Sequence, residues 1–277
     1  MSVEYVHVRL ADRALIALSG PDWRDFLQNL LSQGVADLAP GEARFGALLT
    51  PQGRLLYDLF VVGREDGCWL DVAAEHRAAV IQRLTIYRLR AKVEIAADEA
   101  PVSAAFDQGG EGFVRDPRLP ALGWRGYGVA AAADPAAYDA RRLALGVPGA
   151  ADWGSDKTYP IEANFDLLNG IDFQKGCFVG QETTSRMKRR GQVKSRMLPI
   201  VFEGAAPAHG SEVLAGTLRA GEVLSGIEGR AMALVRLDRI EGAELTVDGR
   251  PVRVERPAWF LERSQQKWEP VLRPAAL

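Results

Sequence analysis

The chain has 277 residues, of which 47% are hydrophobic and 25% are charged, and its formal net charge at pH 7 is −2. This is the composition of a globular protein long enough for two domains, and no apolar run approaches the roughly 20 residues that span a bilayer. The amino terminus lacks the pattern of an export signal, and two cysteines, Cys68 and Cys177, are too few for a disulfide framework. We therefore expect a cytoplasmic protein that does not cross a membrane.

Strand and helix patterns alternate in the first hundred residues. Two strands are expected in 5–20, around a turn at Ala11 and Asp12, and a helix is expected from Pro21 to Gly34. Residues 43–62 predict a β-hairpin, because the Thr-Pro-Gln-Gly sequence in its middle favours a tight turn between two β-prone runs.

The next elements continue the same mixture. A strand is expected at 68–72 and a helix at 75–90, with Val80, Leu84 and Tyr87 facing the core, before the chain returns as a strand at 92–95. Hairpins dominate this order, which favours antiparallel α+β layers over a parallel nucleotide-binding sheet.

The second half of the chain changes character. A helix is expected at 134–145, where it presents Tyr138, within a region rich in Gly, Pro and Ala. After Pro199 the pattern becomes short strands punctuated by glycines, with an Asp-Gly turn at 248–249. This pattern predicts a small all-β barrel at the C-terminal end.

The stretch DFQKGCFVGQE at 172–182 combines a thiol, a lysine, an amide, a carboxylate and two glycines. It is compatible with a tight turn whose Cys177 is a small buried hydrophobic residue. It is equally compatible with a reactive thiol, because Lys175 and the basic residues that follow would stabilise a thiolate. A cysteine hydrolase is not indicated, since no histidine occurs in a recognisable motif near Cys177.

Residues 186–196 contain six Lys or Arg and no acid. Without them the chain has 28 basic and 36 acidic residues, a balance of 28 − 36 = −8, so the positive charge is local. Such a run is typical of a solvated surface, and it also suits a small polyanion. A nucleic-acid partner is not expected, because aromatic residues are not interleaved with the cations.

Five segments together resemble one known family. KGCFVGQE at 175–182, its flanks at 160–173 and 185–198, LSGPDWRDFLQNLLSQGVADL at 18–38 and LLTPQGRLLYDLFVV at 48–62 are similar to the YgfZ-type folate-binding proteins, relatives of the glycine-cleavage T-protein. The resemblance implies a protein that binds tetrahydrofolate and assists the maturation or repair of iron–sulfur clusters. Its partners would be the folate and iron–sulfur client or assembly proteins.

The resemblance also implies an α+β fold, in which two α+β subdomains and a small C-terminal β-barrel form a ring around a folate pocket. On this basis we expect a folate-binding α+β region of two interleaved subdomains at 1–198 and the barrel domain at 199–277.

Site residues are carried over from the family by position. Cys177 is the expected functional thiol, and Tyr138 is expected to stack on the pterin ring. Arg13 stands where some members have a tryptophan, and its guanidinium could lie against the same ring. We expect polar contacts to the ring from Gln181 and Glu182 and to the glutamate tail from Arg189 and Arg190. The remaining expected folate-binding residues are Asp58, Asn164 and Lys175.

An aminomethyltransferase is the alternative function. T-proteins carry two adjacent acids after the glycine of the hairpin turn, whereas this chain has Tyr57 and Asp58 there. Only one carboxylate remains, and an isolated acid is commonly an exposed strand residue. No resident metal site is expected, because two thiols cannot hold a cluster that usually takes four protein ligands. Cys177 would therefore serve as a transient ligand, a redox partner or a thiol that meets a client.

Overall fold

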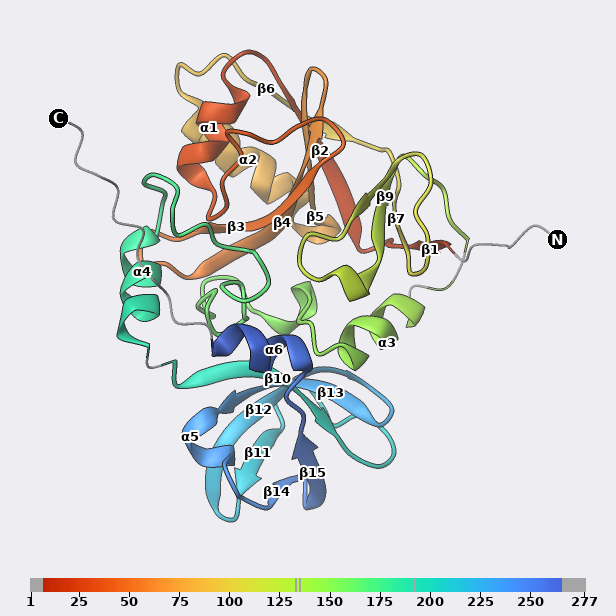
Figure 1. Ribbon diagram of the computed structural model, residues 1–277, viewed down its shortest axis with the longest axis vertical. Coiled ribbons are helices and arrows are strands. Elements are labelled where there is room, and N and C mark those ends of the chain that lie inside the picture. The colour runs from red at the N-terminus through yellow and green to blue at the C-terminus, as the bar shows by residue number, and fades with distance from the viewer. Residues whose placement is uncertain (1–6, 133, 135, 192, 266–277) are drawn as a thin grey trace.

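The computed structural model describes residues 7–132, 134, 136–191 and 193–265, and it contains two antiparallel sheets and a closed barrel (Figure 1). The first sheet has the strand order β3 (Ala43–Leu49), β4 (Leu55–Arg64), β5 (Gly67–Ala73), β2 (Arg13–Ser19), β6 (Glu94–Asp98). The second has the order β1 (His7–Arg9), β7 (Val102–Ala105), β9 (Trp124–Tyr127), β8 (Phe113–Arg115). The barrel runs β10 (Ser195–Val201), β13 (Arg230–Arg236), β12 (Leu218–Ile227), β11 (Glu212–Ala215), β14 (Leu245–Val247), β15 (Arg250–Val254).

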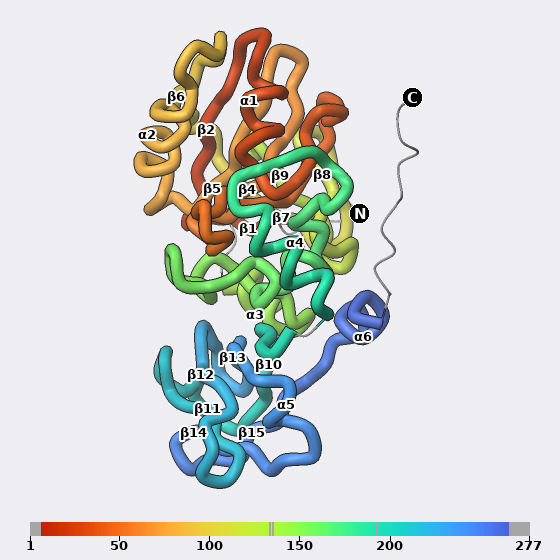
Figure 2. Tube along the Cα trace, turned by 90° about the vertical axis from the view of Figure 1, so that its left-hand side faces the viewer, coloured from red at the N-terminus to blue at the C-terminus, as the bar shows by residue number. Residues whose placement is uncertain are grey.

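Helices cover the sheets and join them to the barrel. The α-helices are α1 (Trp23–Leu30), α2 (Arg77–Arg88), α3 (Ala136–Ala144), α4 (Gln181–Arg190), α5 (Leu237–Ile240) and α6 (Ala258–Ser264). Short 3-10 turns are η1 (Ala74–His76), η2 (Pro120–Leu122) and η3 (Ala150–Asp152). The two sheets lie at one end of the molecule and the barrel at the other, with α3 between them (Figures 1 and 2). No helix of the described residues is long and apolar enough to cross a bilayer.

The expected α+β fold with a C-terminal barrel is confirmed. The hairpin expected at 43–62 is the β3–β4 pair, and Gly53 in its turn has φ of +81°. That turn also lies against the start of α4, because a Cβ at Gly53 would come within 2.9 Å of the carbonyl oxygen of Gly180. A side chain there would therefore be excluded both by the backbone conformation and by a close contact.

One expected core residue is exposed. Val80 and Leu84 of α2 are fully buried, but Tyr87 is 37% exposed. Tyr87 lies in the last turn of α2, and its neighbours Ile86 and Leu89 are also exposed. The helical spacing is correct, but the helix has left the core by its last turn.

The two N-terminal strands belong to different sheets. β1 pairs with β7, whereas β2 pairs with β5 and β6. The turn at Ala11 and Asp12 is therefore a crossing point from one sheet to the other. This crossing places Leu10 to Arg13 at the wall of the central cavity described below.

The barrel begins before the expected boundary between residues 198 and 199. That boundary falls inside β10, in which Pro199 lies opposite Met232 of β13. Pro199 lacks an N–H, but its carbonyl oxygen accepts a hydrogen bond from the N–H of Glu255 at 2.8 Å. The change of sequence pattern at Pro199 predicts a boundary between domains at this residue. In the structure, β10 continues through Pro199.

Candidate functional site

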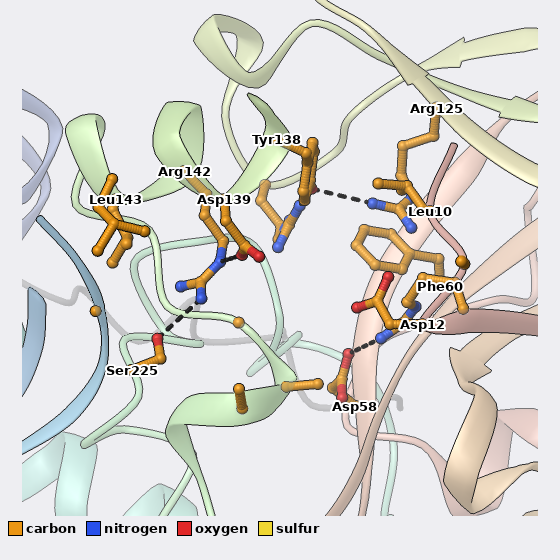
Figure 3. A pocket seen from close by; sticks show the side chains of 18 residues that line it. Leu10, Asp12, Asp58, Phe60, Arg125, Tyr138, Asp139, Arg142, Leu143 and Ser225 are labelled. Atoms are coloured by element: carbon orange, nitrogen blue, oxygen red, sulfur yellow. Dashed lines mark hydrogen bonds and ion pairs between the residues drawn. The ribbon is translucent and has the colours of Figure 1, made fainter. Parts of the chain in front are cut away.

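A cavity of about 380 Å³ lies where the two sheets, α3 and the barrel meet (Figure 3). Its walls come from the crossing between β1 and β2, from β4 and β9, from α3, from the start of η3, and from the end of β12. The lining side chains labelled in Figure 3 are Leu10, Asp12, Asp58, Phe60, Arg125, Tyr138, Asp139, Arg142, Leu143 and Ser225. A site built from all three parts of the fold is the natural place for a ligand.

Asp71 is the centre of the ion network behind this cavity. It is fully buried in β5, and it accepts hydrogen bonds from Arg13 Nε at 2.7 Å, Arg125 Nη2 at 2.5 Å and the Tyr127 hydroxyl at 3.1 Å. Burial opposes the charge of this carboxylate, but the guanidiniums of Arg125 and Arg13 outweigh it and hold the pKa of Asp71 below its usual value. The network is therefore ionised and fixes both arginines.

Arg118 forms a second buried ion pair beside the first. Its Nε and Nη2 donate to the two carboxylate oxygens of Asp116 at 3.0 and 2.7 Å, which is a bidentate pair. Its Nη2 also donates to the hydroxyl of Tyr138 at 2.5 Å. Tyr138 is thereby tied to the loop between β8 and η2.

Phe60 is surrounded by guanidinium groups. The Cζ atoms of Arg125, Arg118 and Arg13 lie 3.9, 4.9 and 5.5 Å from its ring centroid. Cations favour the negative face of an aromatic ring. Phe60 therefore helps to hold three like charges close together under the cavity.

Asp58 is paired with Arg13. The Nη1 atom of Arg13 donates to Asp58 Oδ2 at 2.8 Å, and the exposed fraction of both side chains is 7%. The expectation of an exposed strand acid is thus wrong for Asp58. The ion pair leaves Arg13 oriented by two carboxylates rather than free to lie flat on a ligand ring.

The barrel wall of the cavity is held by Asp152. This buried carboxylate accepts hydrogen bonds from Arg142 Nη1 at 2.8 Å and from the N–H and hydroxyl of Ser225 at 3.0 and 2.5 Å. Arg142 Nη2 in turn donates to the Ser225 hydroxyl at 2.9 Å. These bonds connect α3 and η3 to β12 of the barrel, and the bond between Arg142 and Ser225 is drawn in Figure 3.

The loop that carries Cys177 is organised by Lys175. The ammonium group donates to the backbone carbonyl oxygens of Gln28, Leu31 and Gln33 at 2.5, 2.6 and 3.1 Å. Burial lowers the pKa of Lys175 to about 8. Cys177 itself is exposed, so the interpretation of this thiol as a small buried residue is wrong. Lys175, which the sequence predicts to stabilise the thiolate, instead donates its hydrogen bonds to backbone carbonyls at the end of α1.

Helix α4 contains four of the expected folate-binding residues. Gln181 and Glu182 lie in its first turn, and Arg189 and Arg190 are exposed in its last turn. Helices α3 and α4 lie on opposite sides of the molecule (Figure 1). The residues that line the cavity include none from α4.

Asn164 lies in the protein interior and does not line the cavity. It is fully buried, its Nδ2 donates to the carbonyl oxygen of Met197 at 2.7 Å, and its Oδ1 accepts from Arg196 Nη1 at 3.3 Å. It joins the segment before the thiol loop to the first barrel strand.

Three of the ten expected site residues line the cavity together: Arg13, Asp58 and Tyr138. The others, Asn164, Lys175, Cys177, Gln181, Glu182, Arg189 and Arg190, lie outside its lining, and their roles stay predictions. The sequence motifs do not point to Asp71, Asp116, Arg118, Arg125, Arg142 and Asp152. An acid inside the apolar strand CWLDVA is the available signal for Asp71, because a buried charge requires a partner.

Comparison with known proteins defines the class first. The fold matches the crystal structure of the glycine cleavage system aminomethyltransferase T from Bartonella henselae with a TM-score of 0.73 and 20% identity, over 93% of this chain and 86% of that one. Residues 194–262 match the family described as "CAF17, C-terminal beta-barrel domain". The chain thus has the T-protein fold with a CAF17-type barrel, which confirms the expected architecture.

Sequence relatives identify the family. A protein of Phaeosphaeria nodorum named iron-sulfur cluster assembly factor IBA57 homolog, mitochondrial, is 30% identical over 94% of this chain and 81% of its own length. The human iron-sulfur cluster assembly factor IBA57, mitochondrial, is 30% identical over 84% of this chain and 78% of its own length. The chain belongs to the IBA57 family, which confirms the resemblance to the YgfZ-type proteins. With the Neurospora crassa homolog, 33% identical, the match spans 72% of this chain and about half of the relative, 54%.

The expected cytoplasmic location is contradicted by these relatives, which are named as mitochondrial proteins. Neither the number of cysteines nor the lack of long apolar runs identifies a compartment. Those features therefore do not support a cytoplasmic assignment.

Proposed function

We propose that this protein is an iron–sulfur cluster assembly or repair factor that binds tetrahydrofolate in the central cavity. The observation that carries the proposal is the cavity itself, which is bordered by both sheets and the barrel in a chain of the IBA57 family with a T-protein fold. Its volume of about 380 Å³ lies in the range of about 300–1,000 Å³ typical of small-molecule sites.

The lining residues suit a reduced pterin. Tyr138 provides aromatic surface, and Asp58 has one oxygen, Oδ1, that takes no hydrogen bond from the described residues. That oxygen would accept a hydrogen bond from a ring N–H. Arg13 would hold Asp58 in position for this contact.

The exposed thiol of Cys177 supplies the contact with iron–sulfur proteins. The described residues contain no group of three His, Cys, Asp or Glu placed to hold a metal ion, so a cluster would be cargo that is held mainly by a partner. Cys177 would act as a transient ligand or as a thiol that meets the client. Its partners are therefore iron–sulfur client or assembly proteins.

An aminomethyltransferase is less well supported. The similarity to the Bartonella henselae enzyme, at 20% identity, supports the fold alone. Asp58, the single acid after the hairpin turn, is held in an ion pair by Arg13, and the adjacent position is Tyr57. The two adjacent acids that T-proteins carry at this position are thus reduced to one carboxylate in this chain.

Two measurements test the proposal. Tetrahydrofolate is titrated into the purified protein by calorimetry, and a deletion strain is assayed for iron–sulfur enzyme activity after rescue with wild type or Cys177→Ala. We expect binding, rescue by wild type, and poor rescue by the variant. If tetrahydrofolate does not bind, the folate has no part in the function. Equal rescue by wild type and Cys177→Ala would show that the thiol is not required. Turnover of an aminomethyl donor by the protein would favour the aminomethyltransferase.

A further inference from the structure

The hydroxyl of Tyr138 receives two hydrogen bonds from cations. Arg118 Nη2 donates to it at 2.5 Å and Arg125 Nη1 at 3.2 Å. A tyrosine hydroxyl has two lone pairs and one proton. Both lone pairs are thus occupied, and the oxygen cannot accept a further bond.

The proton of the same hydroxyl has no acceptor among the residues that the structure describes. Arg118 and Arg125 are both fixed from behind, by Asp116 and Asp71 respectively. Tyr138 lines the cavity and is half-buried, and its hydroxyl lies beside Arg125 at the cavity wall (Figure 3). With both lone pairs directed to the arginines, the proton is left to point into the cavity.

Two guanidiniums also polarise this O–H bond. Hydrogen bonds that involve an ionised partner are roughly twice as strong as neutral ones, and linked bonds reinforce one another. The hydroxyl is therefore a strong donor. A ligand group that is itself a donor would meet only donors here, namely the hydroxyl and the two guanidiniums.

Tyr127 provides a contrast within the same network. Its hydroxyl also accepts from Arg125, through Nε at 3.2 Å, but its own proton goes to Asp71 Oδ2 at 3.1 Å. Tyr127 is buried and does not belong to the cavity lining. Two tyrosines thus contact one arginine, and only Tyr138 has a proton left for a ligand.

We propose that Tyr138 donates a hydrogen bond to a carbonyl oxygen of the ligand and so selects ligands with an acceptor at this point of the cavity. The inference rests on the proposed function, because it assigns the interaction to a carbonyl of the bound folate. In this proposal the main contribution of Tyr138 is the hydrogen bond from its hydroxyl, not stacking of its ring on the ligand. An amino group in place of that carbonyl would be rejected.

The test compares tetrahydrofolate binding by calorimetry in wild type, Tyr138→Phe and Tyr127→Phe, with circular dichroism as a check of folding. We expect Tyr138→Phe to weaken binding about tenfold or more, because it keeps the ring and removes only the donor. Tyr127→Phe removes a hydroxyl from the same arginine and should bind within about twofold of wild type.

The outcomes separate this inference from the proposed function. If wild type does not bind tetrahydrofolate, the proposed function fails and the inference fails with it. If wild type binds and Tyr138→Phe binds equally well, only the inference is overturned. An equal loss in both Phe variants would also overturn it, because the effect would then come from displaced Arg125.

Discussion

The ammonium group of Lys175 donates to the carbonyl oxygen of Leu31 at 2.6 Å, across 144 positions of sequence. The same group bonds the carbonyl oxygens of Gln28 and Gln33. Helix α1 ends at Leu30, where backbone carbonyls have no partner within the helix. Lys175 thus caps α1 and holds the thiol loop against it.

The first prediction follows from this cap. Lys175→Met keeps most of the aliphatic side chain but leaves three carbonyls without their donor, so the free energy of unfolding should fall by about 1–3 kcal/mol in urea denaturation. Lys175→Arg should recover only part of the loss, because a planar guanidinium does not fit three convergent acceptors. Lys194→Met, at an exposed position, is the control. Equal stability of the Lys175→Met and Lys194→Met variants would contradict the cap.

The fold could be predicted from sequence largely because local patterns agree with tertiary structure. The β3–β4 hairpin has a proline–glycine turn, and α1 buries Trp23, Phe26, Leu27 and Leu30 at helical spacing. The prediction for Tyr87 is wrong because spacing alone does not show where a helix leaves the core. Family resemblance, rather than spacing, supplied the ring arrangement.

The cavity was only partly predictable, since its residues are brought together by tertiary structure. Arg13 and Asp71 are 58 positions apart, and Arg125 is a further 54 positions along the chain. Their pairing depends on which strands become neighbours. The motif around Cys177 is conspicuous in the sequence, but the cavity wall is formed by residues without any local motif.

The second prediction concerns pH. Asp71 has a folded-state pKa below its unfolded value, so its contribution to stability is present above an unfolded pKa of about 3.9 and is lost as pH falls through the folded value. Asp71→Asn should lower the free energy of unfolding at pH 7 by about 3–5 kcal/mol, because Arg13 and Arg125 stay buried without their charge partner.

The measurement for Asp71 is urea denaturation between pH 7 and pH 3. The wild type should lose more stability over the acid end of this interval than Asp71→Asn does. The matched control is Asp37→Asn, since Asp37 is 83% exposed in a 3.6 Å pair with Arg44. If Asp71→Asn has the same free energy of unfolding and the same pH dependence as Asp37→Asn, the ionised network around Asp71 is refuted.

The third prediction concerns the two thiols. Cys68 is fully buried, and burial raises its pKa, whereas Cys177 is exposed. Native protein treated with N-ethylmaleimide at pH 7.5 should gain one adduct by mass spectrometry, and Cys177→Ala should gain none. Both should gain one more after unfolding in urea. Two adducts on native wild type would show that Cys68 is accessible.

The fourth prediction concerns the contact between the barrel and α3. Asp152→Ala leaves Arg142 and the Ser225 N–H without a shared buried acceptor and should cost about 3–5 kcal/mol of unfolding free energy. Ser225→Ala removes one hydroxyl and should cost about 1 kcal/mol. Asp139→Asn alters a half-exposed pair with the same arginine and serves as control. A loss for Asp139→Asn as large as for Asp152→Ala would contradict the assignment.

The last prediction tests the expected site for the glutamate tail of the folate. Arg189 and Arg190 are exposed at the end of α4, which does not line the cavity and lies across the molecule from α3 (Figure 1). If the ring occupies the cavity, Arg189→Gln with Arg190→Gln should bind mono- and polyglutamylated tetrahydrofolate as wild type does, because no residue of α4 belongs to the cavity lining. Calorimetry with both ligands measures this directly. A selective loss of affinity for the polyglutamate would show that Arg189 and Arg190 bind the glutamate tail. The folate would then have to extend out of the cavity along the molecular surface.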